Sequence, residues 1–286
     1  MVMVVRSTAR RPGSCGPGAR NPDAEERAMS FVTENQPDGT PTWIDLGIPD
    51  LERAMGFYGA LFGWEFQVGP PEMMRYTRCL LGGRPVAALA ENPDPEATAF
   101  WWNVYLATAD CDATARRTTE AGGTLVMEPM DVPGQGRMAM VRDPVGAQFG
   151  LWEGRGLVGC EVVNEPGSLV RNDLITPDPE PARRFYADVF GFTLDANEDL
   201  PGFDFTFLRR PDGHEVGGVM GVPGAPSSSW STCFEVADTD AALARAAEAG
   251  GAPGPAEDFV YGRLATVTDP FGTEFSVIAR PEAQRG

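Results

Sequence analysis

Apolar side chains along this chain follow a helical period in four places and a strand period between them. In the first helical stretch they recur every three or four residues, the spacing that places side chains on one face of a helix. They are Leu51, Ala54, Met55, Tyr58, Leu61 and Phe62. Asp50 precedes this stripe and Gly63 follows it, and these residue types favour the first and last positions of a helix. We therefore predict a helix between Asp50 and Gly63.

Short strands surround this helix, and the whole order of elements recurs. One strand is predicted before the helix and three after it, at Thr42–Ile48, Glu65–Val68, Tyr76–Leu81 and Pro85–Ala90. A second unit of the same order is predicted at Trp102–Thr108, Cys111–Ala121, Leu125–Glu128, Gly136–Arg142 and Ala147–Trp152. Short apolar runs bounded by turn residues are typical of such strands. The first half of the chain therefore contains two βαβββ units.

The second half of the chain repeats the first. Residues 171–192 align with residues 43–64 at an offset of 128, which places Tyr186 on Tyr58. After a two-residue deletion, DPFGTEFSVI (269–278) aligns with DPVGAQFGLW (143–152). A repeat this long is a duplicated domain, because solenoid repeats span roughly 20–50 residues. The elements predicted here are Val170–Thr176, a helix that Asp178 caps and Gly191 ends, Thr193–Asn197, Phe203–Arg209, Glu215–Gly221, Ser231–Val236, Asp240–Ala249, Gly262–Thr268 and Thr273–Ala279.

The repeat also sets the domain boundaries. We predict a first domain over residues 38–157, a linker over 158–168 and a second domain over 169–280. Residues 1–37 lack apolar periodicity near their start, which is rich in Arg, Pro and Gly, and are predicted to be a disordered N-terminal extension. Whether synthesis starts at Met1 or Met29 stays open.

Charge and cysteine content narrow the classes of partner. The formal net charge is −18, which argues against nucleic acid because phosphate binding needs clustered basic side chains. The same charge suits a cationic small ligand, or is simply that of a soluble acidic protein. The chain has no apolar run of the roughly 18 residues that a membrane helix needs. Its five cysteines match no metal or redox spacing, so we expect a reduced, cytoplasmic protein.

The repeated motifs resemble those of a known superfamily. Each copy has a strand, a Pro-Asp pair, a helix ending FY…FG, and DPxGxxF near its end. This pattern is similar to the vicinal oxygen chelate superfamily, which includes glyoxalase I, extradiol dioxygenases and bleomycin-resistance proteins. The resemblance covers nearly everything after residue 38. It implies an α+β fold with two tandem domains, in which paired βαβββ units form a cup-shaped, mostly antiparallel sheet that holds a ligand.

The resemblance also indicates where the enzymes of the family hold a divalent metal. Their ligands, typically His or Glu, come from the first, fourth, fifth and last strands of each cup. The matching positions are Trp43 and Arg171 in the first strand, a place near Ala88 and Gly218 in the fourth, Asn103 and Ser231 in the fifth, and Gly150 and Ser276 in the last. Arg and Trp side chains have no lone pair to give a metal. The single histidine, His214, lies in a predicted turn. We therefore expect neither a metal nor another cofactor.

Other side chains at these strands suit an aromatic ligand. The first copy offers several aromatic side chains with scattered polar groups, which favour stacking and, for a charged ligand, cation–π contact. The second copy is smaller and more polar. The ligand-binding residues that this arrangement predicts are Trp43, Asp45, Trp102, Asn103, Tyr105, Gly150, Trp152, Arg171, Asp173, Ser231 and Ser276.

Structural roles for several of these residues remain as alternatives. Trp43 and Trp152 could instead fill a collapsed cup as core residues. Asp45 and Asp173 recur at one repeat position, so they are either a functional acid pair or residues that hold a backbone turn. Arg171 either clamps a ligand carboxylate or phenolate, or pairs with Asp173 two residues away.

Three functions are compatible with these residues. The first is metal-independent binding of a hydrophobic or aromatic natural product, in antibiotic sequestration or as an accessory to antibiotic biosynthesis. The second is a metal-independent enzyme, a cyclase, isomerase or lyase, with Asp45, Asp173, Arg171 or Tyr105 as catalytic candidates. The third is an interaction domain whose cups are filled. The expected partner is an aromatic or cationic small molecule, without nucleic acid or membrane; a homodimer, and sites within or between the domains, stay open.

Overall fold

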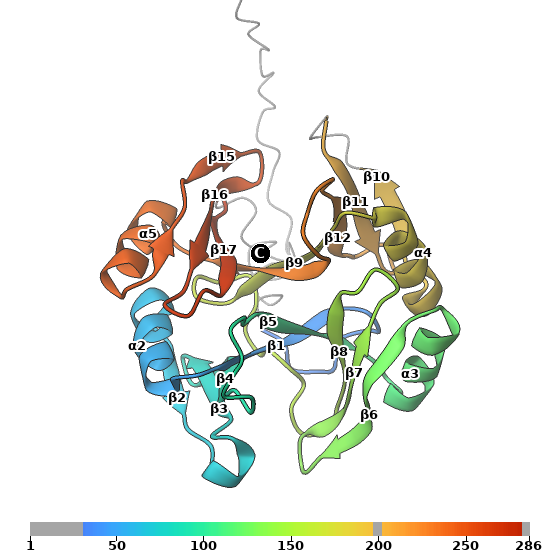
Figure 1. Ribbon diagram of the computed structural model, residues 1–286, viewed down its shortest axis with the longest axis horizontal. Coiled ribbons are helices and arrows are strands. Elements are labelled where there is room, and N and C mark those ends of the chain that lie inside the picture. Colours follow the sequence, from blue (N-terminus) through green and yellow to red (C-terminus); the bar gives the residue numbers. More distant parts are fainter. Residues whose placement is uncertain (1–30, 197–201, 282–286) are drawn as a thin grey trace, which may run out of the picture.

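The computed structural model describes residues 31–196 and 202–281, and within them the chain forms four βαβββ units in two tandem domains (Figure 1). The first domain contains β1 (Pro41–Ile48), α2 (Leu51–Phe62), β2 (Glu65–Gln67), a 3-10 turn (Pro71–Met73), β3 (Thr77–Leu81), β4 (Arg84–Glu91), β5 (Trp102–Ala107), α3 (Cys111–Glu120), β6 (Thr124–Val132), β7 (Gly136–Arg142) and β8 (Gln148–Gly154). The α+β fold class and the order of elements predicted for this half are confirmed.

The second domain repeats this order with small additions. It contains β9 (Leu169–Thr176), α4 (Pro179–Phe190), β10 (Thr193–Ala196), β11 (Asp204–Arg209), β12 (Glu215–Gly221), β13 (Ser229–Glu235), α5 (Thr239–Glu248), β14 (Ala252–Pro253), β15 (Glu257–Phe259), β16 (Gly262–Thr268) and β17 (Glu274–Ala279). Of the predicted N-terminal extension, residues 1–30 lie outside the described residues. Further along it, the Val32 N–H donates to Glu161 O at 3.0 Å, which places this stretch against the linker.

The first helix of each domain begins and ends as its sequence predicts, with one exception. Asp50 accepts a hydrogen bond from the Arg53 N–H at 3.0 Å, which satisfies one of the free donors of the first turn. Gly63 and Gly191 follow the two helices with φ of 74° and 70°, a left-handed backbone that glycine adopts without strain. Asp178 stands before α4, but its side chain accepts no bond from the first turn. The prediction that it caps this helix is therefore wrong for the side chain, and Pro179 alone favours the start there.

Each cup is formed within one domain. The described strands of the first domain form a sheet of order β2-β3-β4-β1-β5-β8-β7-β6, and those of the second follow β10-β11-β12-β9-β13-β17-β16-β14. In both sheets the two units join through an antiparallel pair of first strands, β1 with β5 and β9 with β13. We call the face of each sheet turned away from its helices the first cup and the second cup. The strands of each cup therefore come from a single domain.

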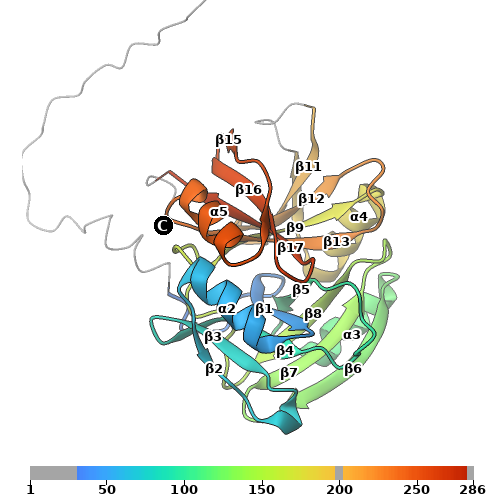
Figure 2. The ribbon, with the colours of Figure 1, turned by 60° about the vertical axis from the view of Figure 1, so that its left-hand side comes forward.

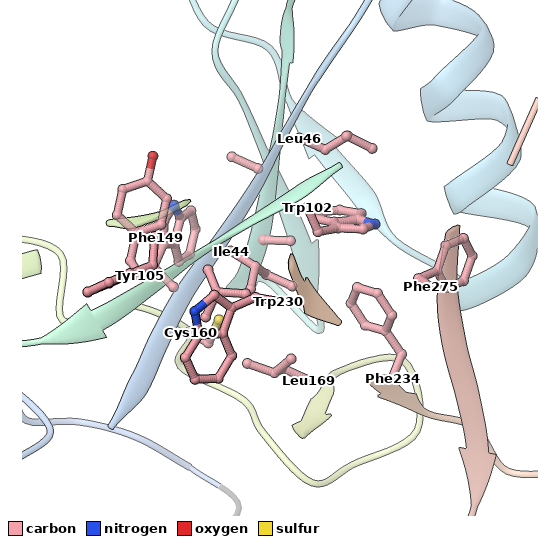
Figure 3. Packing of buried hydrophobic residues seen from close by; sticks show 14 of the residues in the cluster. Ile44, Leu46, Trp102, Tyr105, Phe149, Cys160, Leu169, Trp230, Phe234 and Phe275 are labelled. Carbon is pink, nitrogen blue, oxygen red and sulfur yellow. The ribbon is translucent and has the colours of Figure 1, made fainter. Parts of the chain in front are cut away.

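The two domains share one hydrophobic core between their sheets. Helix α2 contacts α5, and α3 contacts α4, so the helices flank the junction on both sides (Figures 1 and 2). Between the domains, the Trp102 ring meets the Phe234 ring edge-on with centroids 5.4 Å apart, and Phe275 packs beside Phe234 (Figure 3). Edge-to-face pairs of this kind stabilise a core beyond their buried area. The strands that form the cups therefore rest on a rigid common support.

Two equivalent hydrogen bonds link the domains through this core. The Tyr58 hydroxyl donates to Asp269 Oδ2 at 3.0 Å, and the Tyr186 hydroxyl donates to Asp143 Oδ2 at 2.9 Å. Both tyrosines are fully buried, which confirms them as core residues. Burial and the neighbouring carboxylate raise the pKa of both hydroxyls well above the usual value, so they remain donors. The repeated FY and DPxG motifs are therefore partners across the domain junction.

No helix among the described residues is long and apolar enough to cross a membrane.

Candidate functional site

The strand register gathers the predicted polar residues of the first domain on one face. Asp45 lies opposite Asn103 on β5 and beside Ala88 on β4, while Trp43 lies opposite Tyr105. Directly paired residues of neighbouring strands point to the same face of a sheet. The intervening residues Ile44 and Leu46 are fully buried on the other face, in the shared core. The first cup therefore contains these four predicted site residues together.

Asp45 is the centre of a hydrogen-bond network on this face. Its carboxylate accepts hydrogen bonds from the Tyr105 hydroxyl at 2.9 Å, the Asn103 amide at 2.9 Å and the Tyr76 hydroxyl at 3.0 Å. The Trp43 indole N–H in turn donates to the Tyr76 hydroxyl oxygen at 2.8 Å. Asp45 thus binds three side chains, two from β5 and one from just before β3, and it does not hold a backbone turn. All these groups surround a carboxylate that has no cation among its hydrogen-bond partners.

The proton affinity of Asp45 reflects this setting. The residue is 8% exposed, and burial raises the pKa of its carboxyl above the ordinary value, while the bonds from Asn103, Tyr105 and Tyr76 oppose the rise. Burial raises the pKa of Tyr105 and Tyr76 well above the usual value, so both hydroxyls keep their protons. A carboxyl with raised pKa beside fixed donors has the character of a general acid or base.

Aromatic and methionine side chains form the wall of the first cup on its β7–β8 side. Trp152 lies opposite Met138, and Met140 lies opposite Gly150. Gly150 leaves room for the Tyr105 ring, because a Cβ atom there would come within 2.0 Å of that ring. Trp43, Tyr105 and Trp152 are at most 6% exposed, so they close the base of the cup.

The mouth of the first cup carries accessible apolar side chains. Trp101 is 51% exposed, and its indole N–H donates to Asn103 Oδ1 at 3.1 Å, directly above the Asp45 network. Met127 and Met130 on β6 pair with the cup-facing Met140 and Met138, and both are more than 40% exposed. Methionine suits surfaces that adapt to a ligand. Trp101 is not among the predicted ligand-binding residues, although it directly precedes Trp102 in the sequence.

A bridge crosses this mouth. Arg78 shares the cup face, since it pairs with Ala88, and its guanidinium donates to the Gln135 side-chain oxygen in the turn between β6 and β7. The Gln135 carbonyl accepts N–H groups of Arg155, Gly156 and Leu157 at 2.8–3.0 Å, so the turn is firmly attached. Sequence reasoning missed both Arg78 and Tyr76, because β3 carries no repeated motif. Both residues lie just before or within β3, the strand that the sheet order brings beside β4. This position is the signal that could have indicated them.

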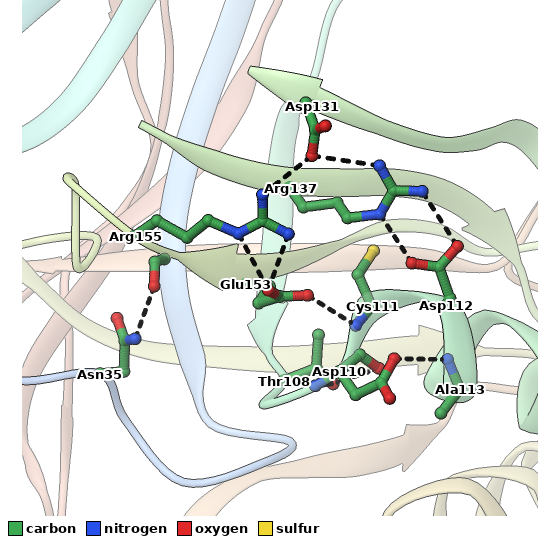
Figure 4. A network of polar contacts seen from close by, with 11 residues as sticks. Asn35, Thr108, Asp110, Cys111, Asp112, Ala113, Asp131, Arg137, Glu153 and Arg155 are labelled. Carbon is green, nitrogen blue, oxygen red and sulfur yellow. Dashed lines mark hydrogen bonds and ion pairs between the residues drawn. The ribbon is translucent and has the colours of Figure 1, made fainter. Parts of the chain in front are cut away.

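An ion-pair network fixes the hairpin that carries this turn (Figure 4). Arg137 donates to Asp112 at 2.7 Å and to Asp131 at 3.1 Å, and Arg155 also donates to Asp131. The second domain has an equivalent, in which Arg263 donates to Asp240 and Asp258. Because the network occurs in both domains, we interpret it as part of the scaffold.

The second cup has a different centre. Asp173 and Arg171 occupy the repeat positions of Asp45 and Trp43, and the Arg171 guanidinium donates to the Asp173 carboxylate at 2.7 Å and to Glu215 at 2.5 Å. The same guanidinium lies over the rings of Phe205 and Phe207, 5.5 and 5.6 Å from their centroids. Burial raises the pKa of Asp173, and the charge of Arg171 opposes this rise. Of the two alternatives for Arg171, the structure therefore has the pair with Asp173.

The remaining predicted residues divide between the faces. Ser231 lies opposite Asp173, and Ser276 lies beside Cys233 on the second cup. Trp102 lies on the other face of β5, opposite Leu46, and packs against Phe234 in the shared core. Its side chain is therefore not part of the first cup, because strand alternation separates it from Asn103. Asp45 and Asp173 lie in separate cups, so they are not an acid pair in one site.

The residues at the metal-binding positions of the family do not fit a metal. In the first cup these positions hold Trp43, Asn103, Ala88 and Gly150, which offer an indole, an amide, a methyl group and no side chain. The Trp43 indole N–H donates to Tyr76. In the second cup the guanidinium of Arg171 takes the first position. Within residues 31–196 and 202–281, no three His, Cys, Asp or Glu side chains lie close enough together to hold a metal ion.

Solved structures with this architecture include a metal-bound glyoxalase and a dioxygenase. A Mn(II)-bound glyoxalase from Novosphingobium aromaticivorans superposes with a TM-score of 0.58 and 20% identity, covering 84% of this chain and 82% of that protein. A homoprotocatechuate 2,3-dioxygenase variant from B. fuscum superposes with a TM-score of 0.60 and 15% identity, covering 88% and 74%. At these identities the likeness concerns the fold alone.

Sequence relatives are much more similar. "Putative glyoxylase CFP32" of Mycobacterium tuberculosis is 39% identical over 255 residues, covering 86% of this chain and 97% of the relative. "Anthracycline biosynthesis protein DnrV" of Streptomyces peucetius is 37% identical over 256 residues, covering 84% and 93%. A family model matches residues 40–151 and again residues 168–277. The chain therefore belongs to the Glyoxalase/Bleomycin resistance protein/Dioxygenase superfamily.

Proposed function

We propose that this protein binds a planar aromatic metabolite in the first cup without a metal, as an accessory protein of antibiotic biosynthesis or as a sequestering protein. The observation that carries the proposal is the first cup itself, in which Trp43, Tyr105 and Trp152 surround the Asp45 network. A flat conjugated ring system would stack on the exposed Trp101 ring above this closed base. The relative named for anthracycline biosynthesis, similar over nearly its whole length, supports this class of ligand.

The mouth of the cup supports ligand entry from the solvent. Trp101, Met127 and Met130 are each 43–51% exposed at this side of the sheet, while the base of the cup is closed. The ligand would rest on these side chains and reach the Asn103 amide and the Tyr76 hydroxyl below them. Such a lining, apolar with a few fixed polar groups, is typical of small-molecule sites. The net charge of −18 would attract a ligand that carries an amine.

A tryptophan-fluorescence titration tests the proposal. Daunorubicin, a planar cationic anthracycline, is titrated into the full chain once with EDTA and once with Mn(II). We expect saturable quenching with the same midpoint in both buffers, because neither cup has a metal-ligand set. Quenching that requires Mn(II) would contradict the metal-independent site, and the absence of saturable quenching with this and a second planar anthracycline would contradict the proposal of aromatic ligand binding.

A second candidate, a metal-independent enzyme acting on such a metabolite, is favoured by Asp45. A buried carboxyl with raised pKa, held by two hydroxyls and an amide, could accept a proton from an acidic C–H or O–H group of a bound phenolic ketone. Tyr105 and Asn103 would then donate to the developing negative charge. Ring closure or isomerisation of this kind balances without an oxidant, because the proton returns to the product.

The two candidates differ in one experiment. The protein is incubated with the metabolite that binds, and the mixture is analysed by chromatography and mass spectrometry. A new product formed by the wild type, and lost in Asp45→Asn while binding stays, would identify an enzyme. Unchanged ligand after prolonged incubation would leave the binding function alone.

A further inference from the structure

A cavity of about 380 Å³ lies beside the second cup, where the linker meets the two domains. Its wall includes the first residues of β9 and of β12, among them Val170, Arg171, Asn172, Glu215 and Val216. Residues of β1 and of the linker, such as Thr42 and Cys160, complete the wall. The volume is within the range of small-ligand and peptide pockets.

The corresponding place in the first domain is occupied by the chain itself. Strands β1 and β4 pair only from Asp45 onward, so the first residues of β1 diverge from β4 and leave a wedge. The linker enters this wedge: the Cys160 N–H donates to Thr42 O at 2.7 Å, and the Glu161 N–H donates to Pro85 O at 2.7 Å. The Thr42 hydroxyl donates to Val158 O at 3.0 Å. A short extended segment is thus bound on both sides, through main-chain groups, as an added strand is.

The second domain has the same wedge. Strands β9 and β12 pair from Asp173 and Gly218 onward, so Leu169–Asn172 diverge from β12 as the start of β1 diverges from β4. Both sides of this second wedge line the cavity. The repeat therefore places the cavity where the first domain binds an extended segment.

Two buried polar atoms in the wall have no partner among the described residues. They are Arg171 Nη2, a donor, and Asn172 Oδ1, an acceptor, and Asn172 is only 1% exposed. Buried polar atoms of this kind are normally hydrogen-bonded, so each indicates a missing partner. Arg210, 8% exposed, also lines the wall, with its guanidinium paired to Asp212 at 2.7 Å. In the first domain the inserted segment brings Glu161, which pairs with Arg84 at 3.3 Å.

We propose that this second wedge binds a short, extended, acidic peptide segment of a partner protein, in the way the linker binds the first domain. Main-chain groups of the peptide would bond β9 and β12, and one carboxylate would accept from the unpartnered Arg171 Nη2, whose Nε and Nη1 already donate to Asp173 and Glu215. The proposal does not depend on the ligand of the first cup, because no residue of that cup lines the cavity.

The linker sequence supplies the probe. Acetyl-Val-Gly-Ser-Glu-Val-amide reproduces residues 158–162 with serine in place of the cysteine. We expect saturable binding to the full chain, followed by NMR or calorimetry. Two altered peptides should each bind about tenfold more weakly. The peptide with glutamine in place of glutamate loses the charge-assisted hydrogen bond, and the peptide N-methylated at serine loses a main-chain donor.

Variants of the protein locate the site. Val170→Trp should abolish binding by filling the cavity, and Arg171→Gln should remove the preference for the glutamate peptide over the glutamine peptide. Arg263→Gln, which loses an ion pair elsewhere in the second domain, is the matched control and should bind as the wild type does. The proposal is overturned if the glutamate peptide does not bind or if N-methylation has no effect. It is also overturned if the peptide binds only to a chain that begins at Phe31, a residue of the cavity wall, since the site would then be filled in cis.

Discussion

The two cups have the same strands and the same central carboxylate, yet the carboxylate has different partners. Burial raises the pKa of both carboxyls, and in the first cup it is two hydroxyls and an amide that donate to Asp45. In the second cup, the Arg171 guanidinium lies against Asp173 and Glu215. A buried carboxylate without a cation holds its proton more tightly, whereas one in an ion pair is held as a charge. The first cup is therefore suited to proton transfer or ligand hydrogen bonding, and the second to a fixed ion pair.

The scaffold around both cups is equivalent, and this gives the largest expected effect. Phe149 and Phe275 occupy the same repeat position and pack between the domains. Phe149→Ala and Phe275→Ala should each lower the free energy of unfolding by about 3–5 kcal/mol, because each leaves a cavity in the shared core. Chemical denaturation should show one transition for both variants. Two separate transitions in either variant would mean that the domains do not share a core.

Equivalent substitutions at the two carboxylates should change the free energy of unfolding with different signs. Asp173→Asn removes one of the two carboxylates that the buried Arg171 guanidinium contacts, and we expect a loss of about 1–3 kcal/mol at neutral pH. Asp45→Asn removes a buried charge that has no cation and keeps a polar group of the same shape. Its unfolding free energy should stay within about 0.5 kcal/mol of the wild type or exceed it. Equal losses in both variants, measured by urea denaturation, would remove the distinction between the cups.

The pH dependence sharpens the same distinction. Because the pKa of Asp45 is raised in the folded protein, its contribution to stability is full below the unfolded value of 3.8 and is lost as the pH rises through the folded pKa. The wild type should therefore lose stability relative to Asp45→Asn as the pH increases above about 4. Denaturation curves recorded from pH 4 to pH 8 check this. A stability difference that is constant with pH would show that Asp45 does not titrate differently in the folded state.

The sequence was sufficient for the scaffold and only partly for the cups. Helix α2, its cap at Asp50 and the buried Tyr58 follow from local spacing, which one copy shows and the other repeats. Trp102 was assigned to the wrong side of β5, since one residue of register exchanges the faces of a strand. Glu215, the second partner of Arg171, lies 44 residues further along the chain. Such a partner depends on sheet order, which no local pattern encodes.

A smaller effect compares the fifth-strand positions. Asn103 connects Trp101 to Asp45 through two hydrogen bonds, whereas Ser231 occupies its place in the second cup. Asn103→Ala should cost roughly 1–2 kcal/mol, since it leaves the buried carboxylate with one donor fewer. Ser231→Ala should change stability by less than about 0.5 kcal/mol. Thermal unfolding followed by circular dichroism measures both, and a larger loss in Ser231→Ala would reverse the assignment of the polar network to the first cup.

The central claim, that the first cup alone binds a planar aromatic ligand without a metal, is tested by calorimetric titration with daunorubicin in EDTA. We predict one ligand per chain, with an affinity that falls about tenfold in Trp101→Ala and is unchanged in Ser229→Ala, its counterpart at the second cup. Two equivalent ligands per chain, or equal affinity in Trp101→Ala and the wild type, would contradict the account.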